Sequence, residues 1–256
     1  MGAMSAAPSH PDATGDGRPL TRTPWDRSDI LLFFLLFFAG LAVAGTILLA
    51  SPVEAFGRSL VRSLSPQSQT AAGSLLLQTV TYLVGVGAVL VLVMGRRHAG
   101  LGTLGWRLPR LRWLPVAVVA AVLSLLFLGA LFDALQSLTQ IQNAQVGAIQ
   151  QEYGHDLALA ILAVSVVAPM AEETFFRGFV YGWMRRRLGV PAAAALSGCV
   201  FAAAHVSYGT QSELLLFLPL ALLGVVLALL YEYSGSLLPG MGVHACFNLV
   251  NVIQIV

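Results

Sequence analysis

Runs of about twenty apolar residues constrain this chain more than any other feature of its sequence. The first run extends from Ile30 to Ala50. As a helix rising 1.5 Å per residue, a run of about 20 residues crosses a hydrocarbon core of ~30 Å. The whole chain is 57% hydrophobic and only 10% charged, which excludes both an ordinary soluble domain and a mostly disordered chain. We therefore expect a membrane protein.

Six further apolar runs are bounded by arginine, glycine, proline or polar turn residues. They cover 74–95, 113–135, 157–184, 191–208, 214–233 and 237–256. The pattern predicts an all-α, polytopic bundle of seven transmembrane helices. Because the runs at 191–208 and 237–256 are short or interrupted, six and eight spans remain alternatives.

The chain divides into a tail and a membrane domain. Residues 1–27 are rich in Pro, Gly, Ser, Asp and Arg and lack periodicity, which predicts a disordered cytoplasmic tail. Residues 28–256 form the predicted transmembrane domain. Arginines cluster before the first run and after the second and fourth, so the positive-inside rule places the amino terminus in the cytoplasm.

Composition also limits the partners and the localisation. The 14 basic residues, all arginine, face 12 acidic ones, and this balance does not build a nucleic-acid-binding surface. The absence of lysine and the abundance of alanine are typical of a GC-rich bacterial genome. We therefore expect a multi-pass protein of a bacterial inner membrane, whose partners are the lipid bilayer and its substrate.

Three ionisable residues fall inside the run 157–184: Glu172, Glu173 and Arg177. Each such residue costs about 2.5–3.5 kcal/mol on insertion scales and therefore needs a reason. Glu172 lies 13 positions before Arg185, which places it roughly 20 Å from the cytoplasmic edge. Glu173 and Arg177 are four apart and share a helix face, whereas Glu172 is turned about 100° away. A buried Glu173–Arg177 pair with an inert Glu172 is the structural alternative to a functional site.

Two other runs carry polar residues to a similar depth. His205 ends the sequence Phe-Ala-Ala-Ala-His, and His244 and Asn248 are four apart on one face of the last run. Together with the glutamates they supply a carboxylate to take a proton from water, an imidazole to assist it, and donors for an oxyanion. We interpret the remaining polar residues of the membrane runs, such as Gln78, Thr79 and Thr81, as packing contacts.

The motifs at these residues resemble those of the CPBP family, the Abi or type II CAAX prenyl protease-like intramembrane endopeptidases. The pattern EExxxR, FxxxH and HxxxN stands here as Glu172-Glu173-x-x-x-Arg177, Phe201-x-x-x-His205 and His244-x-x-x-Asn248, within a similar region of about 101–256. The resemblance implies that Glu172 activates the attacking water with help from His205. It also implies that His244 and Asn248 form the oxyanion hole and that Glu173 and Arg177 orient either the site or the carboxyl end of the substrate.

The resemblance leaves the cofactor open. His205, His244 and either Glu172 or Glu173 would supply three ligands of a catalytic zinc site. The HExxH helix of typical zinc proteases is absent from the sequence. We therefore favour a site without metal and keep zinc as the alternative.

The leading hypothesis is an intramembrane endopeptidase that hydrolyses a membrane-associated or lipid-bearing protein, or a hydrophobic peptide. A proton-coupled transporter that uses the same acids and histidines as a relay is an alternative from another class. A non-catalytic membrane scaffold or immunity protein that binds a partner in the same pocket is a third. The sequence selects neither a particular substrate nor an oligomeric state.

Overall fold

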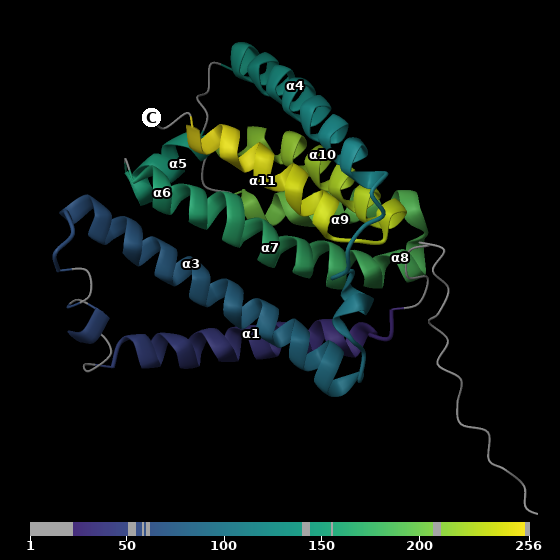
Figure 1. Ribbon diagram of the computed structural model, residues 1–256, viewed down its shortest axis with the longest axis horizontal. Coiled ribbons are helices and arrows are strands. Elements are labelled where there is room, and N and C mark those ends of the chain that lie inside the picture. The colour runs from purple at the N-terminus through teal and green to yellow at the C-terminus, as the bar shows by residue number, and fades with distance from the viewer. Residues whose placement is uncertain are drawn as a thin grey trace, which may run out of the picture.

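The computed structural model describes residues 23–50, 55–57, 59, 62–139, 144–154, 156–206 and 211–253, and these residues form helices without strands (Figure 1). The principal helices are α1 (Arg27–Leu48), α3 (Pro66–Leu90), α4 (Trp113–Thr139), α5 (Ala144–Tyr153), α9 (Val190–His205), α10 (Gln211–Ser234) and α11 (Leu238–Ile253). Between α5 and α9 one continuous helix runs through α6 (Leu157–Ala160), η3 (Ile161–Val167), α7 (Ala168–Glu173), η4 (Thr174–Tyr181) and α8 (Gly182–Leu188). Two short elements, η1 (Val91–Arg96) and η2 (Leu101–Leu104), lie between α3 and α4.

The predicted all-α membrane architecture is confirmed. Five helices of the described part are long and apolar enough to cross a membrane, and two apolar helices are shorter. The five are Arg27–Leu48, Ser68–Arg96, Trp113–Leu138, Leu157–Leu188 and Leu215–Ser234, and the two are Val190–His205 and Leu238–Ile253. All seven fall on the predicted apolar runs, while the number that cross and their orientation stay predictions.

Local sequence signals set the helix ends. Asp26 caps α1 in a capping box with Asp29. Ser65 caps α3, which has Pro66 at its first position. Gly235, with a φ of 67°, turns the chain between α10 and α11. Helix α5 was not predicted, because its ten residues carry no long apolar run.

The continuous helix 157–188 lies at the centre of the bundle and contacts α3, α9, α10 and α11 (Figure 1). It is π-helical over η3 and η4, where the sequence predicted regular helix. Side chains from outside this helix donate to one carbonyl oxygen of each of these two stretches. Asn248 donates to Val164, and Trp25 donates to Phe179. One carbonyl oxygen of each irregular stretch is thus satisfied by a side chain from a distant part of the chain.

The predicted tail lies mainly outside the described residues, which begin at Thr23. Its last residues are packed against the protein. Trp25 is fully buried and stacks on Phe179 with ring centroids 5.5 Å apart. The carbonyl oxygen of Thr23 accepts a hydrogen bond from Arg186. These contacts join the segment before α1 to η4 and α8.

The start of α1 is also joined to the end of η1 by charge. The buried carboxylate of Asp29 pairs with Arg96 at 3.0 Å and with Arg97 at 2.6 Å. Hydrogen bonds from Ser28 and from the Arg97 guanidinium hold the pKa of the neighbouring Asp26 carboxyl below its ordinary value. Helix α1 is therefore fixed at its first turn, and beyond it the helix packs against α3.

Helices α9 and α10 are in close contact through two glycines. A Cβ on Gly224 would lie 2.6 Å from the Cα of Gly198, and a Cβ on Gly198 would collide with the carbonyl oxygen of Ala221. Small residues allow membrane helices to approach this closely. The contact holds the helix that ends at His205 against the helix that carries the Gly224 carbonyl.

We expect Gly198→Ala to lower the free energy of unfolding by about 1–3 kcal/mol, because the added methyl group overpacks the α9–α10 contact. Thermal unfolding of the full chain in detergent measures the loss. Gly73→Ala is the matched control, since Gly73 is helical and a Cβ there meets nothing within 4 Å. Because alanine favours helix, the control should be unchanged or stabilised by up to about 1 kcal/mol. Equal melting temperatures for the two variants would contradict the prediction.

Candidate active site

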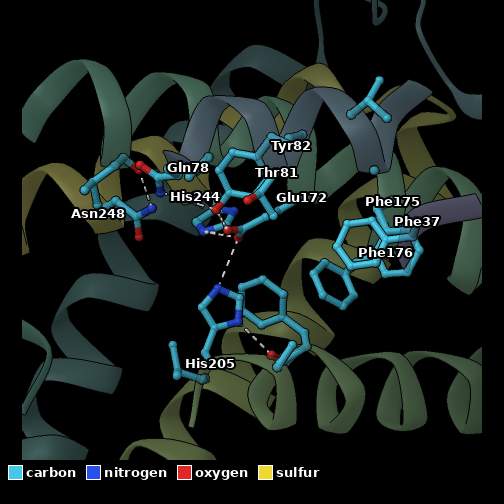
Figure 2. Close-up of a pocket in the computed structure, with 18 of the residues that line it drawn as sticks. Phe37, Gln78, Thr81, Tyr82, Glu172, Phe175, Phe176, His205, His244 and Asn248 are labelled. Atoms are coloured by element: carbon cyan, nitrogen blue, oxygen red, sulfur yellow. Dashed lines mark hydrogen bonds and ion pairs between the residues drawn. The ribbon is translucent and has the colours of Figure 1, made fainter. Parts of the chain in front are cut away.

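A cavity of about 630 Å³ lies among α1, α3, the central helix, α9 and α11 (Figure 2). Its wall includes every candidate site residue of the sequence except Glu173 and Arg177. The polar lining residues are Gln78, Thr81, Tyr82, Glu172, His205, His244, Asn248 and Asn251. The structure therefore brings together side chains from separate apolar runs, as the motifs predicted.

Glu172 lies at the centre of the polar group and is 8% exposed. Its Oε1 accepts a hydrogen bond from the hydroxyl of Tyr82 at 2.5 Å. Its Oε2 lies 3.2 Å from Nε2 of His205 and 3.7 Å from Nε2 of His244, and no hydrogen bond within the protein reaches it. One oxygen of the carboxylate is thus occupied, while the other faces two imidazole rings.

Glu173 points into a second, fully buried layer. Its Oε1 lies 3.1 Å from Arg177 and 3.0 Å from Nδ1 of His244. Arg177 also donates to the carbonyl oxygen of Gly224, and its guanidinium carbon lies 4.4 Å from the ring centroid of Phe201. The predicted Glu173–Arg177 pair is present, and it is linked through His244 to Glu172.

Asn248 lies one turn beyond His244 on α11 and contributes to the cavity wall. Its Nδ2 donates to the carbonyl oxygen of Val164 at 2.7 Å. An amide group has two N–H donors, so the second N–H of Asn248 remains for another acceptor. The hydrogen bond to the backbone of η3 fixes the direction of that second donor.

Tyr82 is a site residue that sequence reasoning missed. It lies on α3, one turn after Gln78, so both side chains share a helix face. Gln78 accepts a hydrogen bond from Tyr153 at 2.7 Å. The interpretation of Gln78 and Thr81 as packing contacts was incomplete, because both line the cavity. The four-residue spacing of Gln78 and Tyr82 was the available signal.

The cavity has two ends of opposite character. Figure 2 shows Phe37, Phe175 and Phe176 on one side of Glu172, and Gln78 and Asn248 on the other. Phe33 and Phe34 of α1 extend the aromatic end, and Asn251 extends the amide end. Glu172 therefore separates an apolar compartment from one rich in hydrogen-bonding groups.

The candidate ligands for zinc do not fit a metal centre as they are arranged here. Among the described residues, no three His, Cys, Asp or Glu side chains form a group that would hold a metal ion. Within the proposed set, Glu173 is already engaged by Arg177 and His244.

Comparison with known proteins matches part of the chain to a protein family. Residues 154–250 match the family model described as type II CAAX prenyl endopeptidase Rce1-like. No curated protein and no solved structure matched the chain. The matched range contains Glu172, His205, His244 and Asn248 and excludes Tyr82.

Removing one member of the buried ion pair should be costly. We expect Arg177→Met to lower the free energy of unfolding by about 3–5 kcal/mol, because it leaves the Glu173 carboxylate poorly compensated in an apolar interior. Adding Glu173→Gln to the same chain should recover part of the loss. Denaturation in detergent measures both variants.

The matched control is Arg187→Met, because Arg187 lies on the exposed surface of α8. Its loss should be about 1 kcal/mol or less. A double variant as unstable as Arg177→Met alone would show that the uncompensated carboxylate is not the cause.

Proposed function

We propose, from the similarity of residues 154–250 to the type II CAAX prenyl endopeptidase Rce1-like family model, that the chain is an intramembrane endopeptidase. Its substrate is a membrane-associated or lipid-bearing protein or a hydrophobic peptide, and its place of action is a bacterial inner membrane. The observation that carries the proposal is the position of Glu172, whose Oε2 faces His205 and His244 at the wall of a large cavity.

Glu172 acts as the general base in this proposal. Its carboxylate removes a proton from a water molecule while the water oxygen forms a bond to the scissile carbonyl carbon. His205, whose Nε2 lies 3.2 Å from Oε2, assists by hydrogen bonding to the attacking water. The proton then passes to the amide nitrogen as the C–N bond breaks, which releases a carboxylate and an amine.

His244 and Asn248 stabilise the oxyanion of the tetrahedral intermediate. Asn248 donates through the N–H that Val164 leaves unused. His244 donates through Nε2. Its other ring nitrogen, Nδ1, lies 3.0 Å from Oε1 of Glu173. Glu173 thus orients the ring, and Arg177 pairs with Glu173.

The two ends of the cavity support the proposed substrate class. An aliphatic chain or apolar side chains fit against the five phenylalanines of the aromatic end. Peptide groups of the substrate find hydrogen-bonding partners at the amide end, where Gln78, Asn248 and Asn251 lie. This arrangement matches a substrate that is apolar on one side of its scissile bond and polar on the other.

Two internally quenched peptides test the proposal with the full chain in lipid nanodiscs. One peptide carries a farnesylated cysteine in a CAAX sequence, and the other is the same sequence without the lipid. Glu172→Gln and His205→Ala should each lower kcat/KM by about 10²–10⁴-fold, the range for loss of general acid–base catalysis. Asn248→Ala should lower it by about 10²–10³-fold, the range for loss of one oxyanion donor.

Glu232→Gln is the matched control. Glu232 is a buried carboxylate that pairs with Tyr181 and Arg185 outside the cavity, so its amide variant should cleave at the parental rate. Cleavage of the lipidated peptide alone identifies a lipid-bearing substrate, and cleavage of both identifies a hydrophobic peptide. A folded Glu172→Gln protein that cleaves at the parental rate would overturn the proposal.

A further inference from the structure

A chain of three hydrogen-bonded side chains ends on Glu172. Tyr153 donates to Oε1 of Gln78 at 2.7 Å. Gln78 donates from Nε2 to the hydroxyl of Tyr82 at 3.5 Å, a long hydrogen bond. Tyr82 donates to Oε1 of Glu172 at 2.5 Å. All three residues precede the matched range 154–250, so helices outside it contribute to the site.

The donors and acceptors of this chain determine where each proton points. A tyrosine hydroxyl has one proton. The Gln78 amide donates to the oxygen of Tyr82, so the Tyr82 proton is directed to Glu172. The carbonyl oxygen of Gln78 is in turn occupied by Tyr153, which keeps the amide in the orientation that donates to Tyr82. Tyr153 and Gln78 therefore both support the hydrogen bond from Tyr82 to Glu172.

The two oxygens of Glu172 consequently differ. Oε1 is the acceptor for Tyr82, whereas Oε2 has no hydrogen-bond partner within the protein and faces Nε2 of both His205 and His244. Among the residues that the structure describes, the ion-pair partners of Oε2 are these two histidines. Oε2 is therefore the carboxylate oxygen that Glu172 shares with the two imidazole rings.

We propose that Tyr82 is a positioning residue that occupies Oε1 of Glu172 and thereby makes Oε2 the oxygen that takes the proton from water. The assignment rests on the proposed function. Tyr82 also restricts the rotation of the Glu172 carboxylate. With Oε1 held by the hydrogen bond from Tyr82, Oε2 stays directed toward the two histidines. Gln78 and Tyr153 act on Glu172 only through Tyr82.

Steady-state kinetics with the two quenched peptides test the role of Tyr82. Tyr82→Phe should lower kcat by about 10–100-fold, the range that corresponds to loss of one hydrogen bond to a charged group. KM should stay within about twofold, since Tyr82 orients the base rather than the substrate. The acid limb of the kcat–pH profile should move to higher pH, because the carboxylate loses a donor that favours its charged form.

Tyr181→Phe is the matched control, because Tyr181 donates to a buried carboxylate, Glu232, at 2.8 Å outside the cavity. It should leave kcat and the pH profile unchanged. Gln78→Leu is the second variant and serves if Tyr82→Phe does not fold. It should lower kcat by a smaller factor and move the acid limb in the same direction. An unchanged kcat and pH profile in the folded variants overturns the proposal.

Infrared spectroscopy separates this proposal from the proposed function, because it needs no turnover. The carboxylate stretching band of Glu172 is identified as the band that disappears in Glu172→Gln. Tyr82→Phe should shift this band, and Tyr181→Phe should not. A band that stays in place in Tyr82→Phe overturns the proposal even where peptides are cleaved. If the parent cleaves neither peptide, the proposed function fails, and the band still decides whether Tyr82 holds Oε1.

Discussion

The structure depends on the compensation of charges buried in the middle of an apolar helix. An unpaired ion in such surroundings is expensive, whereas a paired and hydrogen-bonded one is tolerated. Glu173 and Arg177 pair along their own helix, yet the pair is completed from outside it, by His244 of α11 and by the Gly224 carbonyl of α10. The same few contacts that satisfy these charges therefore fix the helices that line the cavity.

Adjacent carboxylates acquire different roles because successive helical residues point in different directions. Glu173 is 1% exposed and is engaged by Arg177 and His244. Glu172 is turned toward the cavity and keeps Oε2 without a hydrogen-bond partner in the protein. Glu173, whose charge is paired, contributes to stability and to the orientation of the site. Glu172, which keeps an oxygen without a hydrogen-bond partner, is available for chemistry. His244 contacts both carboxylates, so the position of Glu173 influences the position of Glu172.

Local sequence signals predicted the apolar helices and the motif residues, since long apolar runs and four-residue spacings are read directly along the chain. They did not predict Tyr82, because its partner Glu172 is 90 residues away and a tyrosine in an apolar run looks like a packing residue. The π-helical stretches were missed for a related reason. Their carbonyl oxygens accept hydrogen bonds from Asn248 and Trp25, which are distant in sequence.

The irregular backbone of the central helix connects the fold to the chemistry. A π-helical stretch has carbonyl groups that are open to other donors, and such stretches are frequent at functional sites. In η3 the carbonyl of Val164 holds one N–H of Asn248. Because an amide is planar, this hydrogen bond also sets the direction of the other N–H. The departure from regular helix is therefore what aims the proposed oxyanion donor, and a regular α-helix over residues 161–167 would remove the acceptor that holds it.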